Sequence, residues 1–595
     1  MILGFNEMIK MNKIFNNSNI ASFAWMLLIL VSCTDDFLDR PPENSYVASG
    51  FYSTDAEVQF AANALYGGIW FEYPLIQIGD RLGGNYDKRA DPFWTYDVNS
   101  LSPGIQEAYN SLWTVASHAS LTIENLENYA SENVSNEALN SALGEAYVWK
   151  AMAYFYLVRC FGDVPIVHDL GALVQQGPDA SRSLSKNRKE DVYEYIVRML
   201  THAGAILPAE NDPGRINKWS AYGLLAKVYL TRSGLGQDGS RLQSDLDNAV
   251  VYADSVVNHS GLALHPEFKE LFWISKGNLN PENLISIHWT IDPDWGSQNV
   301  LQANMAPEGM TTHGDGWGAW TGVSLDLQDK FGEDARTKGE DRLDNPDSRR
   351  KATIMMDRDT YPEIWQAEGG FTIYWGQKPP DLINGASIQN YAGSLPRKHL
   401  VGSAKDHERE AGRPSEFMKT DLSTHLLRLS DVYLILAEAI IGNAGSTTDA
   451  KALAAYNAVR RRAGADEVSE LYLINNISRS DDYENVTAYN QRSAQSIYDE
   501  RRRELAFEGD NWFDFVRMSY YDPTGTINLI QGQNRLFYTG NPYAEMSLND
   551  AYSSSLTGED FTLPIPPKET DRNPNLLPEA ESAQFDFSSI EFYAR

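Results

Sequence analysis

Two stretches of the chain combine aromatic rings with polar side chains in a way that suits the binding of a sugar. The first contains Phe93-Trp94-Thr95-Tyr96, and the second, Trp295 to Trp320, places tryptophans among glycines. A flat ring can stack on the C–H face of a sugar, and amide, carboxylate or guanidinium groups can hydrogen-bond to its hydroxyls. We therefore expect an aromatic platform with polar ligand groups beside it, made of Trp94, Tyr96, Trp295, Trp317 and Trp320 and of Asp80, Arg81, Asn85, Asn99 and Asn299.

Other chemistry is less well supported by the spacing of residues. Asp334, Glu340 and Asp341 lie close in sequence, and two carboxylates about 5 to 9 Å apart could cleave a glycosidic bond. Arg336 stands between them, which favours a salt-bridge cluster. His313 and Asp315 lack a third metal ligand at a suitable spacing, and the chain has no zinc-helix motif, nucleophile elbow or phosphate loop. We therefore expect no catalytic residue, no metal and no cofactor.

Helical segments must position these stretches. The segment Ser141 to Val164 is apolar on nearly all sides, so it must be covered by neighbours, and Gly162 with Pro165 marks its end. Other amphipathic segments come in pairs separated by short loops, in the manner of tetratricopeptide hairpins. They span residues 189–207, 219–230, 246–257, 427–441 and 449–463. The expected fold is mainly α, a helical hairpin scaffold that supports long irregular segments and a few short strands.

The N-terminus and the middle of the chain set the predicted boundaries. Lys10 and Lys13 precede an apolar run that is too short to span a membrane comfortably, which predicts a signal peptide over residues 1–32. Translation could start at Met1 or Met11. A polar tether should follow over 33–47, and then a single domain over 48–595. Within it we expect a helical scaffold at about 48–265 and 421–520 and a loop-rich insert at about 266–420.

Charge and cysteine content exclude some functions. The formal net charge of -31 repels nucleic acid at long range. Cys33 lies in the leader region, so only Cys160 remains and no disulfide can form within the folded part.

Long motifs give the chain a family resemblance. The segment "GEAYVWKAMAYFYLVRCFGDVPIV" at 144–167 resembles the characteristic helix of the SusD/RagB family of surface lipoproteins. The family's further motifs follow in order, at His425–Ala439, Tyr456–Gly464, Tyr498–Arg517 and Leu563–Leu576. Leu30-Val31-Ser32-Cys33 resembles a bacterial lipobox, which implies acylation of Cys33. After Asn575 the chain runs on where family members often end, so the tail has no counterpart in the family pattern.

The resemblance implies a function as well as a fold. It suggests a lipid-anchored, surface-exposed protein of the outer membrane that captures an oligosaccharide or polysaccharide. Such a protein would deliver the glycan to a SusC-like TonB-dependent transporter without cleaving it. In this pattern the charged run around Glu500 to Arg503 is a structural ion-pair network. Two alternatives stay open: capture of peptides by the same scaffold, as in RagB-like members, and a helical-repeat adaptor that binds only proteins. Clustered tryptophans favour sugar.

Overall fold

The structure is a computed structural model that describes residues 51–67, 70, 72–87, 91–291, 299–376, 378–475, 493–539, 547–550 and 556–595. The predicted signal peptide, the tether and Cys33 lie outside these residues, as does Trp295. Within the described part, every helix is either too short or too polar to traverse a bilayer.

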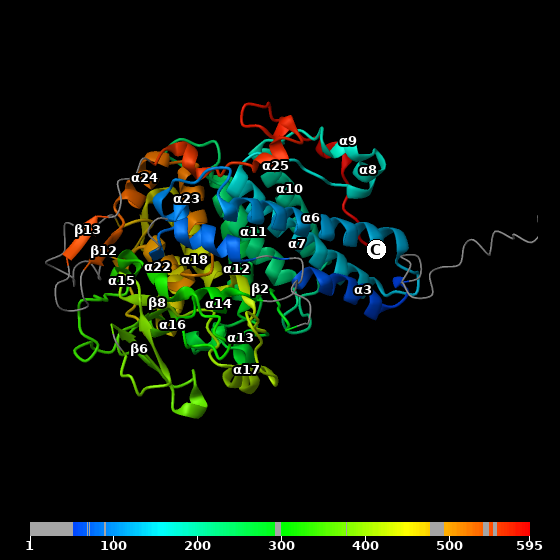
Figure 1. The fold of residues 1–595 in the computed structure, drawn as a ribbon. Coiled ribbons are helices and arrows are strands. Elements are labelled where there is room, and N and C mark those ends of the chain that lie inside the picture. Colours follow the sequence, from blue (N-terminus) through cyan, green and yellow to red (C-terminus); the bar gives the residue numbers. More distant parts are fainter. Residues whose placement is uncertain are drawn as a thin grey trace, which may run out of the picture.

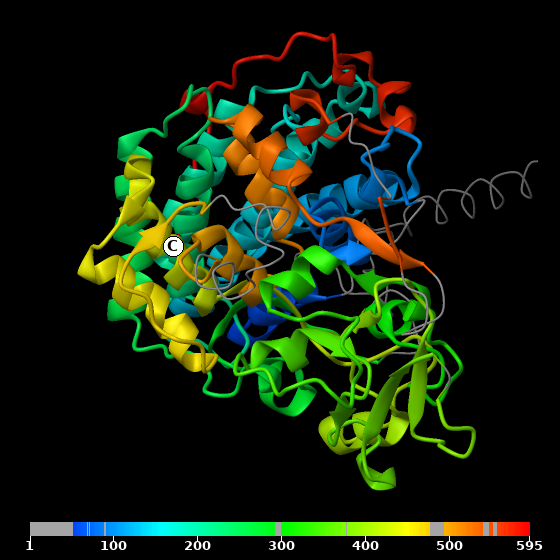
Figure 2. The same ribbon diagram turned by 90° about the vertical axis from the view of Figure 1, so that its left-hand side faces the viewer.

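A row of packed helices forms the scaffold (Figures 1 and 2). Each helix contacts the next, from α6 through α7, α10, α11, α12 and α18 to α19, and α3 packs on α7. The prediction of a mainly α, tetratricopeptide-like fold is confirmed. The bounds of these helices are Asp55–Asn63 (α3), Pro103–Tyr129 (α6), Asn136–Phe161 (α7), Lys189–Ile206 (α10), Lys218–Arg232 (α11), Gln243–His259 (α12), Leu429–Ile441 (α18) and Ala450–Arg462 (α19).

Helix α7 is the central element of this row. It packs between α6 and α10, with α3 against it, and nearly every residue from Ala138 to Phe161 is buried. This explains why its sequence is apolar on all sides. The helix ends at Gly162, whose φ of 70° belongs to the left-handed region that favours glycine. Cys160 is buried and free.

The loop-rich insert leaves the scaffold after α12 and returns before α18, two helices that lie against each other. It has a hydrophobic core of its own, which includes Leu327, Ile354 and Phe371. Short strands brace it, and α14 (Leu301–Met305) and α17 (Ala404–Ala411) lie among them. The strand pairs are Tyr86–Asp87 (β1) with Gly322–Val323 (β3), Asn283–Ile287 (β2) with Thr424–Arg428 (β9), and Ile354–Met356 (β4) with Ser394–Pro396 (β8). Strand Phe371–Trp375 (β6) pairs with both Thr360–Tyr361 (β5) and Gly385–Ile388 (β7), Ser446–Thr447 (β10) with Leu471–Tyr472 (β11), and Leu536–Thr539 (β12) with Ser547–Asp550 (β13).

Three further helices of the second half complete the scaffold. Ile497–Leu505 (α22) packs against α18, and Asn511–Ser519 (α23) and Pro523–Gln531 (α24) follow it.

A buried ion-pair cluster joins α22 to the insert. The guanidinium of Arg428 lies 2.8 Å from Glu504 and 2.6 Å from Glu508, and it also reaches Glu282 at 3.1 Å. Lys398 of the insert lies 2.7 Å from Glu508. All these side chains are almost fully buried. The prediction that the charged run around Glu500 to Arg503 is a structural ion-pair network is therefore confirmed. We call these residues, together with Arg349, Arg460, Arg462 and Glu500, the buried ion-pair cluster.

Acid should destabilise the protein through this cluster. Burial alone would raise the pKa of Glu508, but Arg428 and Lys398 lower it from 4.5 to about 2. The arginines around Glu500 lower the pKa of that carboxylate to about 2 in the same way. A depressed pKa contributes stability that is complete above the unfolded value and is lost as pH falls through the folded value. We expect the free energy of unfolding to fall by a few kcal/mol between about pH 4.5 and about pH 2. Denaturant titrations at a series of pH values measure this, and a constant value across that range would contradict it.

Residues 580–595 wrap along the scaffold instead of ending at its edge (Figure 1). The ring of Phe592 packs against Tyr147 and stacks on His202. At the end of the chain, Arg595 exchanges hydrogen bonds with Asn140 and donates to the carbonyl of Ser131. The tail therefore covers α7 and α10 as a structural strap.

Candidate functional site

Exposed aromatic rings gather on the insert. Trp317 and Trp320 are 48% and 65% exposed, and Tyr391 and Phe417 are 44% and 47% exposed. The rings of Trp317 and Phe417 meet edge to face at 6.2 Å. Gly322, two residues after Trp320, lies against the residues that flank Tyr391. We call Trp317, Trp320, Tyr391 and Phe417 the aromatic patch.

A close approach of two backbones holds the tryptophan loop in place. The N–H of Trp317 donates to Ala303 and that of Gly318 to Ala306, so the loop lies flat on the end of α14. A Cβ on Gly318 would come within 2.2 Å of the backbone of Met305. Only glycine fits there, and the flanking rings remain on the outside.

Enlarging Gly318 should therefore disturb the loop. We expect Gly318→Ala to lower the free energy of unfolding by about 1–3 kcal/mol, because overpacking forces the backbones apart. Chemical denaturation measures the loss. Gly558→Ala is the matched control, because a Cβ at Gly558 meets nothing within 4 Å. Equal stability of the two variants would contradict the close approach.

A buried carboxylate ties the two loops of the patch together. Asp315 accepts hydrogen bonds from the Thr311 hydroxyl and, at 2.5 Å, from the N–H of Met418, next to Phe417. His313 bonds to Ser415 at 3.2 Å in the same contact. These two residues, considered above as metal ligands, are thus engaged in joining loops. Within the described residues no group of three or more metal-ligating side chains comes together.

Two predicted platform rings are buried, and the expectation of their exposure is wrong. Trp94 is 1% exposed and Tyr96 is also buried. The guanidinium of Arg535 stacks on both rings at 4.5 Å and donates to the carbonyl of Trp94. Just before these rings, Asp91 caps a short helix, α5 (Pro92–Thr95), by accepting from the N–H of Phe93.

The predicted polar ligands near these rings are also structural. Asp80 is buried and accepts from Asn85 and from the N–H groups of Phe507 and Gly509, and burial raises its pKa to about 7. Arg81 is buried in an ion pair with Asp91 at 2.7 Å. Asn85 is itself fully buried. None of these three side chains is available to a ligand, because each is buried and bonded to other groups of the protein.

The remaining predicted residues have different outcomes. Asn299 is buried, donating to Leu422 and accepting from Leu301, so its prediction as a ligand group is also wrong. Asn99 is exposed and accepts from the N–H of Leu101 in the turn before α6. Trp295 and Cys33 lie outside the described residues, and their roles stay predictions.

Sequence reasoning missed Tyr391 and Phe417. Each is an isolated aromatic residue in a segment of mostly small or polar residues, "QNYAGS" and "SEFMKT". This isolation was the feature of the sequence that could have indicated an exposed ring. The ring of Tyr391 also meets Phe537 edge to face at 6.4 Å, which extends the aromatic surface toward β12. Exposed Gln389 and Glu416 stand beside these rings and can bond hydroxyl groups.

The carboxylates considered for catalysis are occupied or dispersed. Asp334 forms an ion pair with Arg336 at 2.6 Å, and although burial opposes it, this guanidinium lowers the pKa of Asp334. Glu340 and Asp341 are exposed. The arrangement supports the salt-bridge interpretation of this segment.

Comparison with known proteins gives the family. The SusD family pattern matches residues 281–579, and a second pattern, described as starch-binding associating with outer membrane, matches residues 93–230. A SusD-like protein of Bacteroides ovatus is 32% identical over 534 residues, covering 89% of this chain and 87% of that protein. SusD-like protein P2 of Formosa agariphila is 26% identical and covers 94% and 98% of the two chains.

A solved structure extends the likeness to three dimensions. A crystal structure with a xylogluco-oligosaccharide superposes with a TM-score of 0.72 at 27% identity, covering 89% of this chain and 99% of that one. Sequence motifs, helical architecture and these relatives agree, and the chain belongs to the SusD family.

Proposed function

We propose that the protein binds an oligosaccharide or polysaccharide at the aromatic patch and does not cleave it. The observation that carries this is the pair of open indole rings, Trp317 and Trp320, on a loop braced against α14. Large exposed apolar surfaces are uncommon on soluble proteins unless they bind something. Rings that stay exposed on a fixed loop offer a preformed surface for stacking, which limits the entropy lost on binding.

The relatives support the choice of sugar over peptide. One similar structure was solved with a xylogluco-oligosaccharide. The direct test is affinity electrophoresis and calorimetry with xyloglucan, other neutral polysaccharides, uronate-rich polysaccharides and a tryptic peptide mixture. We expect binding to at least one neutral polysaccharide. Binding to the peptides alone would replace the proposal by peptide capture.

The proposal includes a place in the cell. Acylated Cys33 would hold the protein at the outer face of an outer membrane, and a SusC-like TonB-dependent transporter would receive the glycan. The lipobox-like residues before Cys33 and the outer-membrane description of one matching pattern support this.

Loss of the anchor should release the protein. We expect Cys33→Ala, expressed in its native envelope, to move from the membrane pellet to the soluble fraction, because no acyl chains remain to bury in lipid. Fractionation with immunodetection measures the change, and Cys160→Ala is the control, since Cys160 is buried in the core. Continued pelleting of Cys33→Ala in cells without the transporter would contradict the anchor.

A further inference from the structure

A cavity separate from the aromatic patch lies at the end of the scaffold opposite β6 and α17. It lies beneath two short helices, α8 (Leu170–Gln175) and α9 (Pro178–Ser181) (Figure 1). It has a volume of about 230 Å³, between α6 and α7 on one side and α8, α9 and residues 569–576 on the other. Pockets for drug-sized ligands span about 300–1,000 Å³. This cavity therefore suits a ligand of about one ring.

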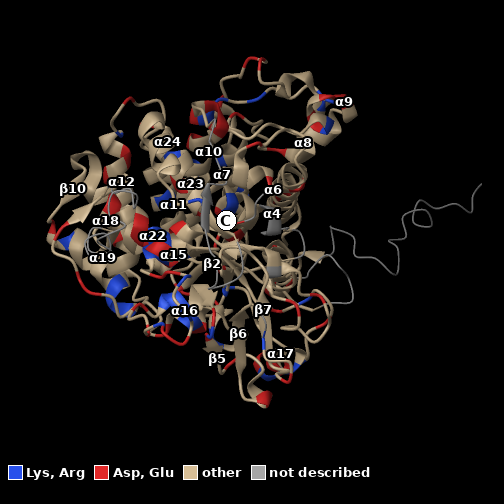
Figure 3. Cartoon of the chain, turned by 60° about the vertical axis from the view of Figure 1, so that its left-hand side comes forward, with Lys and Arg blue, Asp and Glu red and all other residues tan. Residues whose placement is uncertain are grey.

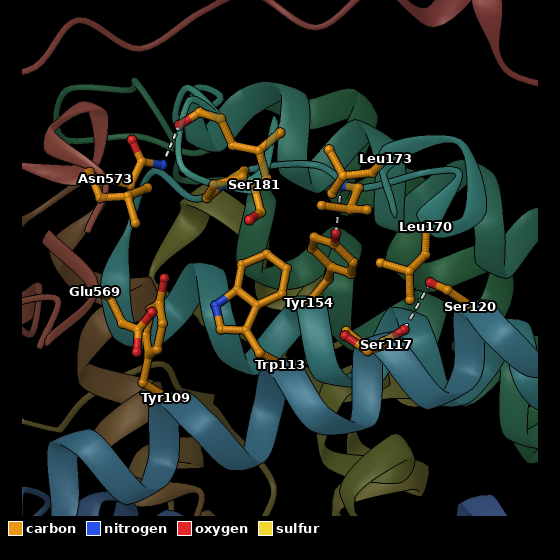
Figure 4. Close-up of a pocket in the computed structure, with 15 residues that line it drawn as sticks. Tyr109, Trp113, Ser117, Ser120, Tyr154, Leu170, Leu173, Ser181, Glu569 and Asn573 are labelled. Carbon is orange, nitrogen blue, oxygen red and sulfur yellow. Dashed lines mark hydrogen bonds between the residues drawn. The ribbon is translucent and has the colours of Figure 1, made fainter. Parts of the chain in front are cut away.

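Aromatic rings form the floor of the cavity (Figure 4). The ring of Trp113 lies 6.1 Å from that of Tyr109 and 5.9 Å, edge to face, from that of Tyr154. The ring of Trp113 is only partly buried and lines the cavity. The side chains of Leu170 and Leu173 close the apolar walls.

Polar groups without partners gather in the same cavity. The indole N–H of Trp113 is buried and makes no hydrogen bond of good geometry, and Figure 4 shows this nitrogen on the side of Tyr109 and Glu569. Burial raises the pKa of Tyr109. The indole of Trp113 opposes that rise as a weak hydrogen-bond donor to the Tyr109 hydroxyl, and the charge of Glu569 adds to it. Within the described residues, the side chains of Glu569 and Ser117 also lack a hydrogen-bond partner. Buried donors are nearly always well satisfied, so the Trp113 indole calls for a better-placed acceptor from a ligand or water, while Glu569 and Ser117 are partly exposed and open to the same ligand.

The mixture of donor and acceptor defines the chemistry of the ligand. A hydroxyl group can accept from the indole N–H and donate to the Glu569 carboxylate at once. An ammonium ion cannot accept from the indole, a carboxylate ion cannot donate to Glu569, and any anion, phosphate included, would be repelled by that carboxylate. Stacking rings beside such groups suit a pyranose. We infer that this cavity binds a single neutral sugar ring, at a site separate from the aromatic patch and independent of it.

The test uses the full mature chain and free D-glucose, D-galactose and D-xylose as probes, with binding followed by saturation-transfer NMR and calorimetry. Glu569→Leu removes the acceptor and Trp113→Phe removes the donor while keeping a ring. We expect at least one sugar to bind, with affinity at least about tenfold weaker in Glu569→Leu and also weaker in Trp113→Phe. Trp320→Ala, whose residue belongs to the insert and does not line this cavity, should bind the sugar as the parent does.

Several outcomes would overturn the inference. These are no binding of any probe at tens of millimolar, unchanged affinity in Glu569→Leu, or loss of affinity in Trp320→Ala. Thermal unfolding of each variant checks that the fold is intact, and Glu569, which is not fully buried, tolerates replacement best. Polysaccharide binding at the aromatic patch is measured separately, so failure of one site does not imply failure of the other.

Discussion

Replacing Trp320 by alanine is expected to weaken polysaccharide binding by at least about tenfold, which corresponds to about 1.4 kcal/mol or more. Aromatic side chains bury a large area when they stack, and tryptophan is among the residues that most often dominate a binding surface. Because the Trp320 ring is 65% exposed, its loss should leave the melting temperature nearly unchanged. Calorimetry against the best ligand of the polysaccharide panel measures the effect.

Phe60 provides a matched control for this experiment. It is 64% exposed, almost the same as Trp320, but lies on α3 of the scaffold. We expect Phe60→Ala to bind the polysaccharide as the parent does. If Trp320→Ala and Trp317→Ala both keep parental affinity, the aromatic patch is not the binding site.

The second large effect concerns stability. Arg428→Met is expected to lower the free energy of unfolding by about 3–5 kcal/mol, because it leaves three buried carboxylates, Glu282, Glu504 and Glu508, short of a cation. Methionine keeps most of the side-chain length, so the loss is electrostatic more than steric. Denaturant unfolding followed by circular dichroism measures it.

An exposed ion pair calibrates that result. Arg461 lies 2.8 Å from Glu467, and both side chains are more than half exposed. We expect Arg461→Met to change stability by less than about 1 kcal/mol, since solvent screens such pairs. A comparable loss in both variants would mean that the effect comes from arginine removal in general and not from the buried ion-pair cluster. Figure 3 shows the charged residues of α16 (Arg349–Thr353), α22 and α19 in neighbouring parts of the fold.

The helices could be predicted because their information is local. The apolar positions of α10, α11, α18 and α19 recur at helical spacing. Helix α7 is apolar on every side, which indicates that it is buried. The return of the chain from the insert to α18 also follows, because the helix pairing resumes there. The short strands of the insert could not be placed, since their partners lie up to 237 residues away, as for Tyr86 and Val323.

The candidate site was only partly predictable for the same reason. Trp94 is covered by Arg535, which lies 441 residues away along the chain. No local sequence pattern predicts a contact at that separation. Asp91 and Asn85 are residue types that mark loops, but here they cap a helix and fill a buried network. Trp317 and Trp320 are exposed, as their glycine-rich surroundings predict. The structural reason for such glycines is visible at Gly318, where a side chain would collide with the backbone of α14.

The strap formed by the last residues has a practical consequence for protein engineering. Ser131 accepts from the Arg595 guanidinium at one atom and donates to the carbonyl of Tyr52 at another, both at 2.9 Å. Residues 52 and 595 are therefore close enough to be joined by a short linker, and a folded segment whose first and last residues lie together suits circular permutation. New termini could be opened in a surface turn such as Gly236–Gly239, where glycines meet no neighbour. A reporter inserted there would leave the contacts of Ser131 with Tyr52 and Arg595 in place.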